Sequence, residues 1–209
     1  MDAIDVGRMA YADCLALQLE LVEARRQDQI PDTLVIVEHD PVITLGRRRA
    51  AADNVLEAGK IPVVEVDRGG DATYHGPGQI VGYPIFKLQD DEQDLHRILR
   101  RIESALIRVL ARTGLEGGPR ENHTGVWCGP HKLVSVGIAV RHWVTYHGFA
   151  LNVDMDLTHF ERINPCGLEA RVMSSVKALG GTSPEGTSLK AIICREIARS
   201  FARRYPGVH

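Results

Sequence analysis

Apolar positions recur three or four residues apart in three segments of the chain, residues 11–26, 91–111 and 188–203. This spacing places apolar side chains on one face of a helix, so we predict three amphipathic helices. The middle segment has the cleanest apolar stripe, formed by Leu95, Ile98, Leu99, Ile102, Leu106, Val109 and Leu110. In the first segment we expect the buried face to consist of Tyr11, Leu15, Leu19 and Val22.

Short runs rich in β-branched residues lie between these helices and predict strands. They are residues 33–37, 42–45, 62–66, 80–86, 132–140 and 143–153, with a shorter run at 125–127. The last two long runs are separated by a short turn, which predicts a hairpin or meander. Strands outnumber helices and several adjoin through short turns. This pattern favours an α/β (α+β) fold with a mixed, largely antiparallel sheet and flanking helices over a doubly wound parallel sheet.

Size and charge limit the classes of protein to consider. The chain has 209 residues, which suits one domain, 1–209, large enough to bury its own core. A net charge of −2 gives no basis for bulk binding of nucleic acid. The acidic start lacks the apolar segment of a signal peptide, and no run reaches the ~18 apolar residues of a membrane span. We therefore expect a cytoplasmic protein with no membrane partner.

Four cysteines are widely spaced, with no CxxC pair and no zinc-finger spacing. Cys14 and Cys194 fall on apolar helix patterns and are expected to be inert, while Cys128 ends a predicted strand and is intermediate. Cys166 lies in a loop between a proline and a glycine, which leaves its thiol accessible. It is the candidate nucleophile, although an inert buried cysteine gives the same pattern.

A nucleophilic cysteine needs a partner that stabilises its thiolate. His75 and His147 are the best placed of the nine histidines, and Lys132 at the start of an apolar strand is the alternative. A solvated lysine at a strand end is the commoner arrangement. Two unit charges ~4 Å apart at an effective dielectric of ~20 interact by about 4 kcal/mol. An ammonium at that distance is therefore sufficient to bring a thiol pKa from ~8.5 to below neutrality.

Residues 68–79 are dense in glycine, which indicates a loop whose backbone closely approaches another group. The loop is not a P-loop, because no Gly-Lys-Ser/Thr ends it, and not a dinucleotide loop, because a strand follows it. We interpret it as the wall of a site for an apolar chain with a polar reaction centre; a purely structural turn is the alternative. Three arginines at 47–49 could dock an acidic carrier or a phosphate, or form a solvated loop.

Four motifs, in order along residues 35–176, together resemble the lipoyl(octanoyl) transferase family. The strongest is RGGDATYHGPGQIVGYP at 68–84, supported by KLVSVG at 132–137, WVTYHGFALNV at 143–153 and INPCG at 163–167. One departure is MSSV at 173–176, where a run similar to VTSL is more usual in the family. The resemblance implies a fold like that of the biotin/lipoate protein ligases.

The resemblance also implies roles for individual residues. Cys166 corresponds to the acyl-carrying nucleophile, and Lys132 to the lysine that lowers the pKa of that cysteine. His75 and His147 are then expected to shape the substrate site rather than act as bases. The implied substrate-binding residues are Arg68, Gly69, Gly70, Asp71, Ala72, Thr73, Tyr74, His75, Ser135, Val136, Gly137, Gly148, Phe149 and Ala150. No metal and no cofactor are implied.

The activity implied by the resemblance is the first step of endogenous protein lipoylation. An octanoyl group would pass from acyl carrier protein to Cys166, and then to a lysine of the lipoyl domains of 2-oxoacid dehydrogenase complexes or of the glycine cleavage H protein. We expect a monomer that needs no nucleotide. The alternatives are an ATP-dependent lipoate or biotin ligase on the same fold, and a catalytically silent module that only binds these domains. The presence of both Cys166 and Lys132 favours the transferase.

Overall fold

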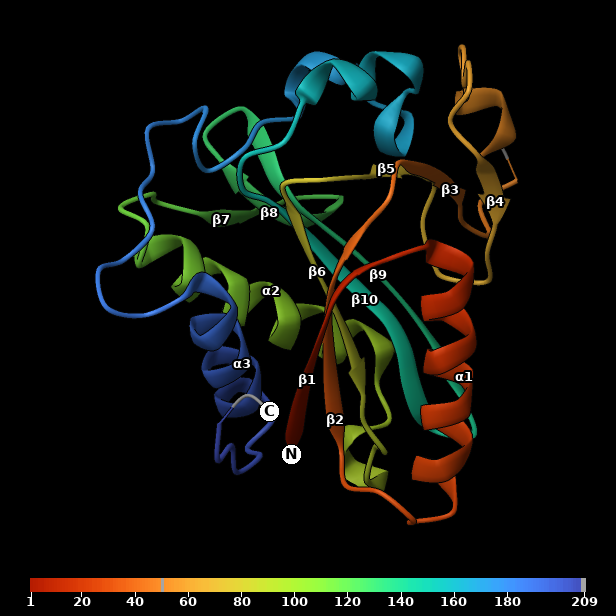
Figure 1. Ribbon diagram of the computed structural model, residues 1–209, viewed down its shortest axis with the longest axis vertical. Coiled ribbons are helices and arrows are strands. Elements are labelled where there is room, and N and C mark those ends of the chain that lie inside the picture. The colour runs from red at the N-terminus through yellow and green to blue at the C-terminus, as the bar shows by residue number, and fades with distance from the viewer. Residues whose placement is uncertain (50, 208–209) are drawn as a thin grey trace.

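A twisted seven-stranded sheet forms the centre of the molecule (Figure 1). The computed structural model describes residues 1–49 and 51–207, with the backbone but not the side chain of Cys166. The strand order is β1-β2-β6-β10-β9-β8-β7, in which β1 and β2 are parallel and every other neighbouring pair is antiparallel. The strands are β1 Asp2–Met9, β2 Thr33–His39, β6 Gln79–Ile85, β7 Gly118–Arg120, β8 His123–Cys128, β9 His131–Arg141 and β10 Val144–Asn152. The predicted mixed, largely antiparallel sheet is confirmed.

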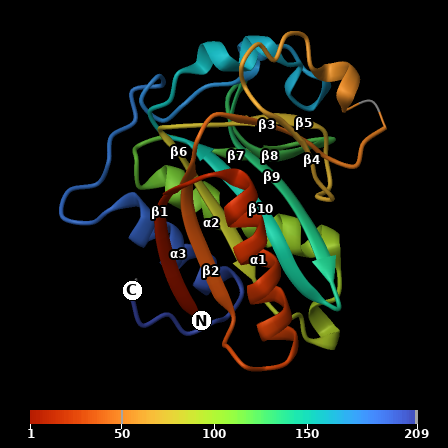
Figure 2. The same ribbon diagram turned by 45° about the vertical axis from the view of Figure 1, so that its right-hand side comes forward.

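Helices cover both faces of the sheet. Helix α1 (Tyr11–Arg26) lies over one face, while α2 (Leu95–Ala111) and α3 (Leu189–Ser200) lie on the other (Figures 1 and 2). None of these helices, in the part of the chain that is described, is long and apolar enough to cross a membrane. Caps define the start of two helices, because the Asp94 carboxylate accepts the Arg97 N–H at 3.1 Å and the Ser188 hydroxyl accepts the Ala191 N–H at 3.2 Å.

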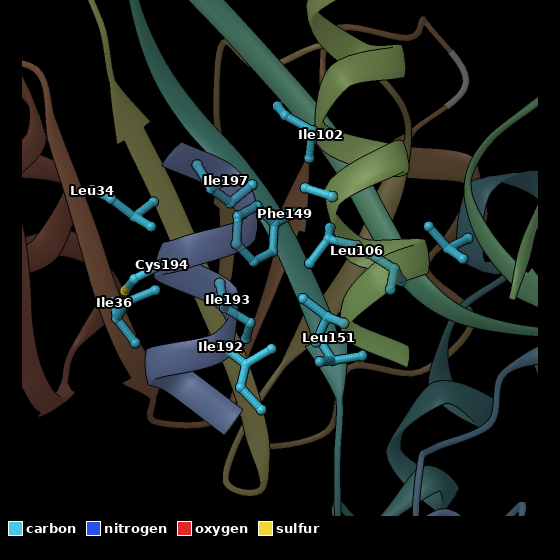
Figure 3. Packing of buried hydrophobic residues seen from close by; sticks show 14 of the residues in the cluster. Leu34, Ile36, Ile102, Leu106, Phe149, Leu151, Ile192, Ile193, Cys194 and Ile197 are labelled. Carbon is cyan, nitrogen blue, oxygen red and sulfur yellow. The ribbon is translucent and has the colours of Figure 1, made fainter. Parts of the chain in front are cut away.

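Strand β2 is apolar on both sides because each of its faces meets a helical layer. Leu34 and Ile36 belong to the cluster formed with α2 and α3, which also includes Phe149 and Leu151 of β10 (Figure 3). Val35 and Val37 point the other way and pack in the cluster beneath α1. Successive side chains of a strand alternate between faces, so a strand buried on both faces appears in the sequence as a continuous apolar run.

The residues buried by α1 differ from the predicted stripe. The helix has the predicted bounds, but it buries Tyr11, Cys14, Gln18 and Val22, while Leu19 is 38% exposed. Gln18 is buried because its side-chain oxygen accepts the His147 N–H of β10 at 2.9 Å. A polar residue therefore occupies a core position that periodicity assigned to leucine.

A second, three-stranded sheet lies at one end of the main sheet, with the order β4-β3-β5. It consists of β3 Val42–Leu45, β4 Val63–Glu65 and β5 Ala72–His75. Strand β5 lies inside the segment that we expected to be loop, and its pairing with β3 is what orders it. Strand β1 was also not predicted; it gains its structure by pairing with β2. Three short 3-10 turns, Leu157–Arg162, Pro165–Gly167 and Ala170–Val172, follow β10 and pack beside the small sheet.

Candidate active site

A cavity of about 460 Å³, counted with its mouth, lies where the segment leading into β5 crosses β9 and β10. Its walls include most of the predicted substrate-binding residues, which come from three separate segments of the chain. These are Arg68, Gly70, Asp71, Thr73, His75, Ser135, Val136, Gly137, Gly148, Phe149 and Ala150. The fold thus brings together predicted residues that are as much as 82 positions apart in the sequence, Arg68 and Ala150.

Three predicted residues lie elsewhere. Ala72 and Tyr74 alternate with the cavity-lining Thr73 and His75 along β5, so they face a different apolar cluster, which contains Phe160. Gly69 lines an adjacent cleft instead, and its N–H donates to the Ile138 carbonyl at 3.0 Å.

Glycines allow the backbones around the cavity to approach one another closely. Gly137 and Gly148 are paired neighbours on β9 and β10. A Cβ on Gly148 would clash with the Gly82 carbonyl oxygen, and a Cβ on Gly137 would lie 2.7 Å from the Gly69 carbonyl oxygen. The loop carrying Gly69 therefore lies directly on the sheet, which closes one side of the cavity.

Arg68 braces that loop from inside. Its buried guanidinium donates to the Thr44 carbonyl at 3.0 Å, to the Thr44 hydroxyl at 2.9 Å and to the Asp71 carbonyl at 2.7 Å. These bonds join β3 to the turn before β5. Arg68 accordingly shapes the cavity wall through its contacts with the protein.

Sequence reasoning missed three cavity residues, Tyr11, Val81 and Tyr83, whereas His147, which it expected to shape the substrate site, also lines the cavity. Tyr11, Tyr83 and His147 carry a polar group on an aromatic ring, and they concentrate on the side of the cavity near α1. The Tyr11 hydroxyl lies 3.4 Å from His147 Nδ1, and His147 Nε2 lies 2.8 Å from Asp67 Oδ1. A usable sequence signal was a pair of tyrosines, Tyr11 and Tyr83, each with a polar tip, at positions that otherwise follow core patterns.

Both cavity histidines are held uncharged near neutral pH. Burial lowers the pKa of His75 to about 3, and burial also lowers the pKa of His147, although its bond to Asp67 acts in the opposite direction. His75 Nδ1 donates to the Gln79 side-chain oxygen at 2.7 Å, while Gln79 Nε2 donates to Asn152. A histidine with so low a pKa is a poor base, which fits a shaping role.

A wider cleft adjoins the cavity, and Lys132 is among its lining residues. The two hollows share four wall residues, Gly70, Asp71, Val136 and Gly137. Lys132 is only 2% exposed, and its Nζ lies 5.8 Å from the centre of the Trp127 ring. The alternative of a solvated lysine at a strand end is therefore wrong.

The turn that contains Cys166 lies beside Asp71. The Cys166 side chain, the predicted nucleophile, lies outside the described part of the structure. The backbone of its turn is fixed, because Asn164 N–H donates to the Asn54 carbonyl at 2.7 Å and Asn54 Nδ2 donates to Asp71 Oδ1 at 2.7 Å. A Cβ on Gly167 would lie 3.9 Å from Asp71 Oδ2. This turn therefore borders the junction of the two hollows.

The three cysteines whose side chains are described have free thiols. Cys14 and Cys194 are buried, and burial raises the pKa of the Cys14 thiol to about 11. Cys128 is half-buried, and burial raises its pKa as well. Among the described residues, no group of three histidine, cysteine, aspartate or glutamate side chains is arranged to hold a metal ion.

Comparison with known proteins identifies the family. The chain matches the model of the lipoyl protein ligase A/B catalytic domain over residues 10–198. It is 47% identical over 191 residues to an octanoyltransferase of Syntrophotalea carbinolica, covering 91% of this chain and 90% of that protein. It is also 47% identical over 212 residues to an octanoyltransferase of Rubrobacter xylanophilus, covering 95% of this chain and 92% of that protein.

Solved structures support the same fold. Lipoate-protein ligase A bound with ATP superposes with a TM-score of 0.74 at 16% identity, covering 98% of this chain and 87% of that one. Biotin protein ligase from Aquifex aeolicus, without ligand, superposes with a TM-score of 0.54 at 9% identity, covering 96% and 69%. The biotin/lipoate ligase-like fold is thus confirmed, and the close sequence relatives show that the chain belongs to the octanoyltransferase family of acyltransferases.

Proposed function

We propose that this enzyme transfers an octanoyl group from acyl carrier protein to a lysine of lipoyl domains through a thioester on Cys166, with Lys132 as the proton-transfer partner. The observation that carries the proposal is a convergence at Asp71. Asp71 lies beside the turn containing Cys166, lines the cavity, and lines the cleft that contains the buried Lys132. The names of the close relatives support octanoyl transfer as the reaction.

In the first step, the Cys166 thiolate attacks the carbonyl carbon of the donor thioester. The bond between that carbon and the carrier sulfur breaks, and the carrier leaves as a thiol after taking a proton from the Lys132 ammonium. One thioester replaces another, so no nucleotide is consumed. Backbone N–H groups of the glycine-rich loop are suited to stabilise the negative oxygen of the tetrahedral intermediate.

In the second step, the amine of the acceptor lysine attacks the carbonyl of the acyl-cysteine. An amide forms, the thiolate of Cys166 leaves, and the proton lost by the amine returns to Lys132. The amide is more stable than the thioester, so this step drives the transfer forward. The acceptors proposed are the lipoyl domains of 2-oxoacid dehydrogenase complexes and the glycine cleavage H protein.

The apolar walls of the cavity suit an acyl chain. Val81, Val136, Phe149 and Ala150 supply apolar walls beside the polar aromatic residues. Each methylene removed from water contributes about 0.8 kcal/mol. The free energy of burying the chain therefore depends on how many methylenes the cavity accepts.

Mass spectrometry of the intact protein tests the covalent step. Mixed with octanoyl carrier protein and no nucleotide, the protein should gain the mass of one octanoyl group and lose it when a lipoyl domain is added. Cys166→Ala should abolish the gain, whereas Cys128→Ala, a matched change at the half-buried cysteine, should leave it intact. The proposal fails if Cys166→Ala is still acylated, or if octanoylation of the lipoyl domain requires ATP, as in a ligase.

A further inference from the structure

Helix α2 carries a carboxylate in its buried face. Glu103 is 1% exposed and stands between Ile102 and Leu106 along an otherwise apolar stripe. A buried carboxylate is costly unless it is paired and hydrogen-bonded. An apolar side chain at this place would satisfy packing alone, so the contacts of Glu103 need a further explanation.

Glu103 has two hydrogen-bond partners with different surroundings. One carboxylate oxygen accepts the Gly125 N–H of β8 at 2.7 Å. The other accepts Arg100 Nη1 at 2.6 Å, from a side chain that is 60% exposed. The arginine pairs from the solvent side, while the glycine lies on the side of the sheet.

Gly125 connects this carboxylate to Lys132. A Cβ on Gly125 would overlap the Val134 carbonyl oxygen and would lie 2.7 Å from Lys132 Cε and 3.4 Å from Lys132 Nζ. Its φ of +128° is likewise one that side chains rarely adopt. The end of the lysine therefore packs directly on the glycine whose N–H is held by Glu103. A carboxylate and an ammonium flank the same residue.

We propose that Glu103 is a positioning residue for Lys132. Its hydrogen bond holds Gly125 against the lysine, and its charge, shielded from water, stabilises the ammonium and through it the thiolate of Cys166. This inference rests on the proposed roles of Lys132 and Cys166.

Other charged or titratable groups lie in the same region. His96 of α2, His123 of β8, Arg48 and Asp71 line the cleft that contains Lys132, and Arg120 of β7 stacks on Trp127, whose ring also lies near Lys132. Arg48 is largely exposed, so solvent screens its charge, and the buried Asp71 already accepts hydrogen bonds from Asn54 and Ala72. Glu103 differs from these groups because it is buried and accepts a hydrogen bond from the N–H of Gly125, the residue on which the end of Lys132 packs.

The test is the pH dependence of alkylation of Cys166 by iodoacetamide, measured with Cys128→Ala as the background. Glu103→Gln keeps an oxygen that can accept the Gly125 N–H but loses the charge. The midpoint of the alkylation profile should rise by about one pH unit, which corresponds to a roughly tenfold slower reaction at pH 7. A folded Glu103→Gln protein with an unchanged midpoint would overturn the inference.

Arg100→Gln keeps the test decisive if Glu103→Gln does not fold. Removing this exposed positive charge leaves the carboxylate less neutralised, so the midpoint should fall. Arg112→Gln makes the same charge change at the end of α2 and should shift the midpoint of the alkylation profile less. The inference is contradicted if Arg100→Gln leaves the midpoint unchanged, or if the two variants shift it equally. Formation of the octanoyl thioester by the wild-type protein tests the proposed function separately, so the two failures can be distinguished.

Discussion

Replacing Ala150 with valine should shorten the acyl chain that the enzyme prefers. Ala150 is buried on β10, paired with Val81 on one side and with Ser135 on the other, and it lines the cavity. Valine adds two carbon atoms without adding a polar group. Because protein interiors are closely packed, the added atoms take up space that the chain would otherwise fill.

The size of the effect follows from the methylenes displaced. Two carbon atoms exclude about two methylenes, and at about 0.8 kcal/mol each the octanoyl group loses ~1.6 kcal/mol of binding, or roughly 15-fold in kcat/KM. A hexanoyl group is two methylenes shorter and should lose little. The preference for octanoyl over hexanoyl should therefore fall roughly 15-fold in Ala150→Val.

The assay measures kcat/KM for transfer from hexanoyl, octanoyl and decanoyl carrier protein to a lipoyl domain. Ala139→Val is the matched control, since Ala139 lies in the same apolar cluster on β9 but does not line the cavity. It should keep the wild-type order of chain lengths. If Ala150→Val keeps the octanoyl preference while folding normally, or if Ala139→Val changes that preference equally, the cavity does not measure chain length in this way.

Three further changes test the fold. Gly78→Ala should destabilise the protein by about 2–4 kcal/mol in urea unfolding, because φ is +82° and a Cβ would strike the backbone of the loop after β10; a loss below 1 kcal/mol would contradict this reasoning. Arg203→Ala should cost about 1–2 kcal/mol in the same assay, since Arg203 donates to the nearly buried carboxylates of Asp32 at 2.5 Å and Glu92 at 2.8 Å, which keep Arg25 and Arg101 as partners; an unchanged midpoint would mean that the remaining partners compensate fully. Because burial lowers the pKa of His75 to about 3, this histidine is protonated at a higher pH in the unfolded chain than in the folded protein. The free energy of unfolding should therefore fall by about 1.4 kcal/mol per pH unit as the pH drops from 6 to 4. His75→Gln should remove this contribution to the pH dependence of unfolding. Equal pH dependence in the wild type and in His75→Gln would contradict the proposed effect of His75.

Local pattern alone predicted several elements well. The helix 11–26 has the predicted bounds, and strands 33–37, 42–45 and 80–86 correspond closely to β2, β3 and β6. These segments satisfy their own hydrogen bonds or present a continuous apolar run, so neighbouring residues are enough to identify them. Strand β5 was missed because its glycine-rich flanks resemble a loop, and only pairing with β3 makes it a strand.

Some residues of the site could likewise be predicted from the sequence, while others depended on the tertiary structure. The family resemblance implied that Gly70, Asp71, Ser135 and Gly148 bind substrate, and the structure brings all four to one cavity. Which side chains of β5 face the cavity depended on the orientation of that strand relative to the main sheet.

The sequence by itself determined which chemical groups this protein has available: a loop cysteine, a lysine at the start of an apolar strand, and glycines that tolerate close contact. Only the tertiary structure decided that Lys132 is buried, that Tyr11 of the first helix completes the cavity, and that Glu103 lies across Gly125 from the lysine. Each of these facts concerns residues from different elements. The free energy that fixes such contacts comes from burial and strand pairing across the whole chain, which no local pattern of residues records.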